Sequence, residues 1–188
     1  ALPYWCEICD VAKCRNTKKM SNQSVRDPQK FGEICTGDHQ NYKRINEVGG
    51  LAGRKYSFNQ LDLATKFKSC TPVKSLNTDE TFAAITRFKG EQNINLYYSD
   101  NYQSIKRAVY KQNIAHEFSQ PGIHETNAVI ERCNQDINNG IRCYLMQAGL
   151  PGCFWTLAGP CYCFHENARN DVPVDWLRRE MKISGQPS

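Results

Sequence analysis

Three carboxylate side chains lie at positions in the sequence where they could bind a metal ion and take part in catalysis. Asp38 and Asp100 each follow a stretch of strand-forming residues, and Glu131 lies near the start of a long helical segment. Ligands of open α/β sheets gather at the carboxyl ends of strands, so three acids on three elements can meet at one rim. Carboxylate oxygens are what hard cations such as Mg²⁺ require; without a cation the acids would repel one another and at least one pKa would rise. The chain has 19 acidic residues, so spacing alone does not select these three.

The segment "YYSDNYQSIKR" carries the second acid. We expect a strand over residues 94–99 with Ile94, Leu96 and Tyr98 on one face. Asp100 shares their parity but lies just past the strand end, and a basic segment follows it. The alternative is that Asp100 only ends the strand and has no functional role.

The third acid lies on a helix predicted over residues 126–148. At 100° per residue, one stripe predicts the core face: Val129, Ile130, Cys133, Ile137, Ile141, Tyr144 and Ala148. Glu131, Gln135, Asn138 and Arg142 lie on the opposite, polar face. No cation lies three or four positions from Glu131, so it has no local ion pair. The helix alone favours a solvated surface residue at Glu131. The alternative is that Glu131 is a metal ligand, and that neighbouring amides, Asn134 among them, contact a phosphate backbone.

The elements that must position these acids follow a mixed order. We expect strands over residues 31–38, 54–63, 66–73, 94–99 and 114–119, with the second and third forming a hairpin. Helices are predicted over 77–88, 103–112, 126–148 and from 154 towards 165, the first capped by Asn77 with Glu80 three residues on. Three strands followed by strands alternating with helices predict an α/β fold, with helices packed on a mixed sheet.

The composition is that of a globular chain. Hydrophobic residues make up 40% and charged residues 23% of the 188 residues, and no apolar run approaches the roughly 20 residues of a membrane span. The net charge of +5 permits an acidic partner such as nucleic acid without demanding one. Ten cysteines without a secretory signal indicate reduced thiols and an intracellular location. Because the first residue is not Met, we expect a fragment or a processed piece.

Two cysteine-rich stretches raise the question of zinc. Cys6 and Cys9 have the spacing of half a zinc site, and Cys14 is either a third ligand or a free thiol. Four basic residues follow these cysteines: Lys13, Arg15, Lys18 and Lys19. They either form a solvated surface or contact a DNA backbone.

The second cysteine-rich stretch lies near the end of the last predicted helix. Cys153, Cys161, Cys163 and His165 allow a second zinc site, but interleaved aromatics favour buried cysteine packing. Two further histidines, His116 and His124, flank a loop near the acids. We expect each to be a hydrogen-bonded or exposed histidine rather than a general base.

Several motifs together resemble the catalytic core of a copia-type retrotransposon integrase. They are "YYSDN", then "NAVIERCNQDI", then "RCYLMQAGLPGCFW", with "GRKYSFNQLDLATKFKSCTPVKS" similar to the family's hairpin and "CEICDVAK" to its zinc-binding module. The resemblance implies an RNase H-like fold and an Asp-Asp-Glu triad of Asp38, Asp100 and Glu131, the last two 31 positions apart. Glu33 and Asp62 are rivals for the first acid, and we set Asp62 aside because it falls in the second predicted strand.

The resemblance also implies an activity. Two Mg²⁺ or Mn²⁺ ions, roughly 3.5–4 Å apart, would activate water or a DNA 3′ hydroxyl and stabilise the leaving oxygen, giving end processing and strand transfer. The partners would be element and target DNA and further copies of the chain, in the nucleus or otherwise the cytoplasm, without a membrane. Zn²⁺ would bind an N-terminal module over residues 1–30, followed by a core over 31–170 and a tail over 171–188.

The sequence departs from the family's pattern at three places. "YQSI" follows the Ser-Asp-Asn, "PGIHET" replaces the usual loop, and Asn127-Ala128 stands where the family has Asn-Gly. A catalytically inert or domesticated relic that binds nucleic acid is therefore the alternative, and a nuclease that only hydrolyses is the third possibility.

Overall fold

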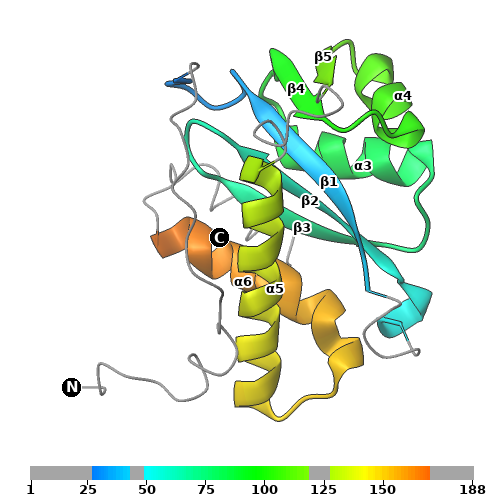
Figure 1. The fold of residues 1–188 in the computed structure, drawn as a ribbon, viewed down its shortest axis with the longest axis vertical. Coiled ribbons are helices and arrows are strands. Elements are labelled where there is room, and N and C mark those ends of the chain that lie inside the picture. Colours follow the sequence, from blue (N-terminus) through cyan, green and yellow to red (C-terminus); the bar gives the residue numbers. More distant parts are fainter. Residues whose placement is uncertain (1–26, 43–48, 119–127, 170–188) are drawn as a thin grey trace.

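A central five-stranded sheet organises the chain (Figure 1). The computed structural model describes residues 27–42, 49–118 and 128–169. The strands are β1 (Cys35–Asn41), β2 (Tyr56–Asp62), β3 (Lys68–Val73), β4 (Leu96–Ser99) and β5 (Ala115–Phe118), in the order β3-β2-β1-β4-β5. The pairs β1–β2 and β2–β3 are antiparallel, whereas β4 pairs in parallel with both β1 and β5. The predicted mixed sheet and its hairpin are confirmed.

The first strand begins later than predicted. Residues 31–34 form a turn, in which Glu33 donates its amide hydrogen to the Lys30 carbonyl at 3.2 Å and Gly32 has a φ of +84°. A Cβ on Gly32 would lie 2.1 Å from the Asn93 carbonyl oxygen, so the close approach also requires glycine. The shift moves Asp38 from the end of the predicted strand to the middle of β1.

Among the described residues, four α-helices flank the sheet. They are α3 (Thr78–Lys89), α4 (Gln103–Lys111), α5 (Ala128–Ala148) and α6 (Trp155–Arg169), with short 3₁₀ helices at Leu51–Gly53 and Gly152–Phe154. The predicted cap of α3 is confirmed, because the Asn77 side chain accepts from the Glu80 amide at 2.8 Å. The Glu80 carboxylate bonds the amide of Lys74 and the hydroxyl of Ser75 instead of Asn77.

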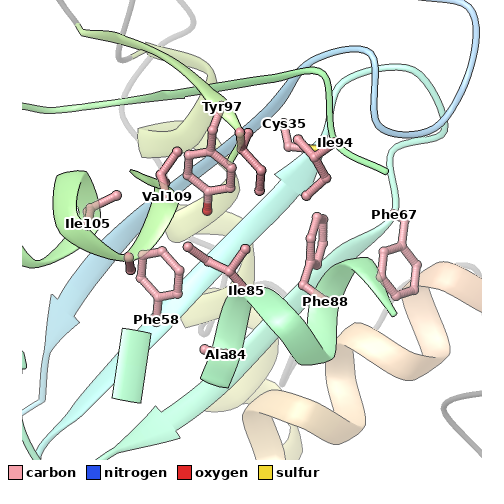
Figure 2. Packing of buried hydrophobic residues seen from close by; sticks show 12 residues of the cluster. Cys35, Phe58, Phe67, Ala84, Ile85, Phe88, Ile94, Tyr97, Ile105 and Val109 are labelled. Carbon is pink, nitrogen blue, oxygen red and sulfur yellow. The ribbon is translucent and has the colours of Figure 1, made fainter. Parts of the chain in front are cut away.

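Each face of the sheet carries its own hydrophobic core. On one face α3 and α4 pack against the sheet around the fully buried Phe58, Ile85 and Tyr97 (Figure 2). On the other face α5 and α6 pack around Ile137 and Trp155. The sheet is therefore the middle layer of a three-layer α/β fold, and two helical layers position whatever lies at its rim.

Of two face assignments made from the sequence, that of β4 was wrong, and that of α5 was confirmed except at its ends. In β4 the fully buried residues are Tyr97 and Ser99, not the alternate set that includes Leu96 and Tyr98. Helices cover both faces of the sheet, so the period-two contrast between an apolar and a polar face is weak. In α5, Val129 is 38% exposed, Ala148 is exposed as well, and the polar Asn134 is buried in their stead.

The cysteines of α6 do not form a zinc site. Cys163 is buried in the same core as Cys70 and Cys133, whereas Cys161 is exposed. His165 is exposed and shares a 2.7 Å hydrogen bond with the Tyr144 hydroxyl. The second zinc hypothesis thus fails, and buried packing holds for Cys163 but not for Cys153, which is partly buried, or for Cys161.

The N-terminal residues lie outside the described part of the chain. This concerns the predicted zinc ligands Cys6 and Cys9, the Lys13–Lys19 cations, and also His124 and residues 171–188. In the part of the chain that the structure does describe, no helix is both long and apolar enough to cross a membrane.

The contact between α5 and α6 yields a stability prediction. A Cβ added at Gly140 would lie 2.2–2.4 Å from ring carbons of the buried Tyr162. Gly140→Ala should destabilise the fold by roughly 1–2 kcal/mol, because overpacking outweighs the helix propensity gained. Urea unfolding measures this, and Gln147→Ala at an exposed site of the same helix should change stability by less than about 0.5 kcal/mol. Equal or higher stability of Gly140→Ala would contradict the packing described.

Candidate functional site

Asp38 and Asp100 lie beside each other on neighbouring parallel strands. Cys35 of β1 pairs with Tyr97 of β4, and Thr36 pairs with Tyr98. Continuing this register by two residues brings Asp38 opposite Asp100, the first residue after β4. The expectation that the strands of these two acids lie side by side is confirmed.

The two carboxylates interact electrostatically. Burial, and after it the neighbouring charge of Asp100, raise the pKa of Asp38 to about 6. Hydrogen bonds from Gln40 Nε2 at 3.1 Å and Asn134 Nδ2 at 2.8 Å, both to Oδ2, act in the opposite direction without cancelling the rise. Burial also raises the pKa of the half-buried Asp100, against a hydrogen bond from the Tyr102 amide at 3.3 Å. The rim thus holds two like charges that a cation would stabilise.

A chain of side-chain hydrogen bonds holds Asp38 in place. Ser57 donates to Asn59 at 2.9 Å, Asn59 donates to Asn134 at 2.9 Å, and Asn134 donates to Asp38. Asn59 lies directly opposite Asp38 in the β1–β2 pair, so the sheet register and α5 meet at this carboxylate. Asn134 is only 4% exposed and uses both its amide oxygen and its amide nitrogen. Its predicted contact with a DNA backbone is therefore wrong.

The sequence carried a signal for this chain of hydrogen bonds that we did not use. The segment "SFNQLD" in β2 places amide, hydroxyl and carboxyl groups in a central strand. Ser57, Asn59, Gln60 and Asp62 are all fully buried there. Polar side chains at this density in a buried strand must bond one another or neighbouring elements.

Glu131 is placed one helical turn before Asn134. It is exposed in the first turn of α5, and side chains three positions apart on a helix are neighbours, with Cβ atoms roughly 5–6 Å apart. Within residues 27–42, 49–118 and 128–169, no three His, Cys, Asp or Glu side chains gather closely enough to hold a metal ion. The structure brings Asp38 and Asp100 together and leaves Glu131 one helical turn from the Asn134 that bonds Asp38, without completing a three-ligand cluster among the described residues.

The other residues of the polar helix face have mixed environments. Gln135 is exposed, and Asn138 accepts a hydrogen bond from the Tyr42 hydroxyl. Arg142 is exposed and donates to Asn139. Gln135 and Arg142 therefore stay candidates for DNA contact, whereas Asn138 already has a partner within the fold.

The rivals for the first acid have structural environments. Asp62 is fully buried and accepts from the Gly32 amide at 3.0 Å and from the amide and hydroxyl of Thr65 at 2.7 Å each. It faces Cys35 in the sheet, three positions away from the pair of Asp38 and Asn59. Glu33 lies before β1 and accepts from the Gln29 amide. Both carboxylates hold the turn that precedes β1.

His116 closes the rim on the side of β5. Its Nε2 lies 2.8 Å from the Ser99 hydroxyl, which itself donates to the Asp100 carbonyl at 2.8 Å. Since the hydroxyl proton is used there, Ser99 accepts from His116, and Nε2 is the protonated nitrogen. Burial lowers the pKa of His116, and nearby Lys106 lowers it further, which keeps the ring neutral. The expectation of a hydrogen-bonded histidine is confirmed, although its buried Nδ1 has no partner among the described residues.

The arrangement defines a class of protein. A mixed five-stranded sheet with helices on both faces, and two acids on adjacent parallel strands, is the RNase H-like fold of integrase catalytic cores. Two solved structures share it. A chain of the simian T-cell lymphotropic virus intasome, in complex with PP2A regulatory subunit B56 gamma, matches with a TM-score of 0.59 and 17% identity over 85% of this chain and 56% of that chain. The catalytic core domain of BIV integrase matches with a TM-score of 0.52 and 12% identity over 70% of this chain and 81% of that one.

A curated relative points to the same class. It is the retrovirus-related Pol polyprotein from transposon TNT 1-94 of Nicotiana tabacum, 27% identical over 154 residues. The alignment covers 73% of this chain and 12% of the polyprotein, so the chain spans about an eighth of that relative's length. This similarity and the fold agree: the chain has the fold of integrase catalytic cores.

One family model gives a different result. The model described as the Omptin family matches residues 18–159, which is most of the chain. This match conflicts with the curated relative and with both solved structures, which agree with one another. The sheet order and helical layers of the described residues agree with the fold of integrase cores.

The raised pKa of Asp38 predicts a pH dependence of stability. A carboxyl group whose pKa is about 6 in the folded state and 3.8 as a free side chain binds its proton more tightly when folded. Stability should therefore fall as pH rises from about 4 to about 6, by up to about 3 kcal/mol from this group. Asp38→Asn should remove that part of the slope, measured by urea unfolding at several pH values. An unchanged slope in Asp38→Asn would show that Asp38 titrates normally.

Proposed function

We propose that the chain is the catalytic core of a retrotransposon integrase of the copia type, which processes and joins DNA ends with divalent metal ions. The observation that carries the proposal is the pair of Asp38 and Asp100 on adjacent parallel strands, each with a raised pKa. The fold and the similarity to a transposon Pol polyprotein support it. The activity, the DNA partners and the assembly into oligomers are part of the proposal.

The donor set fits a hard cation. Asp38 and Asp100 supply oxygen ligands with mutual repulsion, which a bound Mg²⁺ or Mn²⁺ would relieve. Glu131 is the third candidate ligand, one helical turn from the amide that bonds Asp38. When bound, the cations would supply charge neutralisation at the scissile phosphate and an activated water or 3′ hydroxyl.

The chain's own residues prepare the site. Asn134 and Gln40 fix the orientation of the Asp38 carboxylate through Oδ2. Ser99 ties the backbone at Asp100 to β5 through His116. With a pKa of about 6, Asp38 is mainly ionised at neutral pH and is ready to bind a cation without losing a proton. Phosphodiester chemistry of this kind needs positioning and electrostatic stabilisation, and no cysteine nucleophile.

Cleavage of a DNA end tests the proposal. Asp100→Asn keeps the shape of the side chain and removes its charge, so Mg²⁺- or Mn²⁺-dependent cleavage should fall at least about a hundredfold. DNA affinity should stay the same or rise, because a negative charge is lost. Asp79→Asn is the matched control, since that exposed acid pairs only with Lys111 on the surface. Equal cleavage by wild type and Asp100→Asn would refute the assignment, and joined products would separate an integrase from a nuclease that only hydrolyses.

Cation binding can be measured without DNA. Millimolar Mn²⁺ should raise the thermal midpoint of wild type by mass action, because the folded site alone binds it. The rise should be lost in Asp38→Asn and Asp100→Asn and kept in Asp79→Asn. Equal Mn²⁺-induced rises in all four proteins would place the bound ions elsewhere.

A second candidate function is nucleic-acid binding without catalysis. The observation that favours it is that Glu131 does not complete a three-ligand cluster among the described residues. Wild-type protein that binds DNA, but neither binds Mn²⁺ nor cuts a DNA end, would establish this inert relic instead.

A further inference from the structure

A basic and aromatic pocket lies between α4 and β5. The cavity has a volume of about 470 Å³ and is lined on one side by Lys106, Arg107 and Tyr110 of α4, and on the other by His116 and Phe118 of β5. We refer to it as the α4–β5 pocket. It lies on the α3 and α4 face of the sheet, whereas Asp38 bonds to α5 on the other face.

We propose that the α4–β5 pocket binds an unpaired nucleotide of a DNA strand that passes over the rim beside Asp100. The base of this nucleotide would stack on the exposed aromatic rings, and the phosphates of the DNA strand would contact the two cations of α4. The inference rests on the proposed function, because it takes the substrate to be DNA, and it adds where a single strand is held.

The charge of the pocket favours a polyanion. The α4 sequence "QSIKRAVYK" contains three cations and no acid. Lys111 pairs with Asp79 at 3.1 Å, but neither Lys106 nor Arg107 forms an ion pair within the described residues. Lys106 Nζ instead lies 5.4 Å above the Phe118 ring, so a free cation and an aromatic face are offered together.

The aromatic side chains are exposed where a folded domain would normally bury them. Tyr110 is 82% exposed and Phe118 is 36% exposed. Stacking of bases on such rings is tolerant of sequence, and combined with backbone cations it is the usual way in which proteins hold a single strand. The pocket therefore matches a nucleotide better than a small acidic ligand, which would leave the rings unused.

The position of the pocket links it to the acids. Phe118 is the β5 partner of Ser99, the residue before Asp100, and neighbouring strands lie roughly 4.8 Å apart. His116 lines the pocket and bonds Ser99, which bonds the Asp100 carbonyl. A strand whose scissile phosphate lies at Asp100 can thus reach the pocket by crossing one strand of the sheet.

A second copy of the chain is a poorer occupant. In a symmetric dimer through this surface, the same patch appears on both sides. The basic patch of Lys106 and Arg107 would then face a second copy of itself, and the like charges would repel. The test nevertheless includes the oligomeric state as an outcome.

The experiment measures affinity for a duplex with a short single-stranded extension, with and without an abasic site at each extension position, in the absence of divalent metal. In wild type, removing the base that occupies the pocket should weaken binding about tenfold. Tyr110→Ala should weaken binding by a similar factor and show no further loss with the abasic strand. Tyr110→Phe keeps the ring and should behave as wild type.

A matched pair of charge variants tests the phosphate contact. Lys106→Gln and Lys111→Gln remove the same charge from the same helix, inside and outside the pocket. Lys106→Gln should lose several-fold more DNA affinity than Lys111→Gln. The slope of its log affinity against log salt should become shallower by about 0.9, which corresponds to one phosphate contact.

Three outcomes would overturn the proposal. The first is that the abasic strand lowers DNA affinity equally in wild type and in Tyr110→Ala. The second is that wild type does not bind the extended duplex. The third is that Tyr110→Ala changes the oligomeric state while its DNA affinity stays the same. Failure of cleavage with base-dependent binding intact would instead refute the proposed catalysis and leave the pocket assignment standing.

Discussion

The hydrogen bonds of the Asn134 side chain are the interaction on which the rest of the site depends. This amide accepts from Asn59 in the sheet and donates to Asp38, so it joins α5, β2 and β1 at one buried point. Turning α5 about its axis would break both bonds and leave buried amides unpaired, at a cost of about 1–3 kcal/mol each. The same bonds fix where the first turn of α5 lies, and with it Glu131. A polar contact thus determines the relation between the helix and the acids, whereas the apolar core around Ile137 only requires that the helix be nearby.

The opposite face of the sheet imposes a second constraint. Gly37, the residue before Asp38, has no side chain because a Cβ there would lie 2.1 Å from the Tyr97 hydroxyl and 3.0 Å from the Phe58 ring. Tyr97 is fully buried in the core shown in Figure 2. Its hydroxyl donates to Gln60 at 3.2 Å. Because β1 lies this close to a large ring on one face, Asp38 must project to the other face, towards α5. The core around Tyr97 and Phe58 therefore excludes a side chain at Gly37. The α5 face provides a hydrogen-bond donor, Asn134, for the Asp38 carboxylate.

Much of the fold follows from local patterns, and most of the site does not. The hairpin, the cap at Asn77 and the long α5 are predictable because turn residues, caps and periodicity act over a few residues. The faces of β4 were not predictable, since helices on both sides remove the contrast between apolar and polar faces. The burial of Asn134 was missed for a related reason. A helical wheel places it at the edge of the core stripe, next to Ile141, but its amide side chain argued against burial. Its pairing with Asn59, 75 positions away in sequence, accounts for that burial. Asp38 and Asp100 could be paired from the resemblance, whereas the effect of the Asp100 charge on the pKa of Asp38 required the strand register.

The raised pKa of Asp38 separates a prepared site from a purely structural one. Asp62 shows what a structural carboxylate looks like in this chain: it is fully buried, yet backbone amides and a hydroxyl bond both of its oxygens. Asp38 is less buried, but it lies beside a second acid and has a pKa of about 6. Placing two acids together destabilises the folded protein by itself, because their ionised forms repel. Such an arrangement therefore lowers the stability of the fold unless a cation neutralises the two carboxylates. Lys68 shows that the chain does pair a partly buried acid with a cation where the purpose is structural, since it bonds Asp136 at 2.7 Å. No comparable cation bonds Asp38 or Asp100 within the described residues, and this difference between two acidic environments in one chain is the strongest physical argument for a function at the rim.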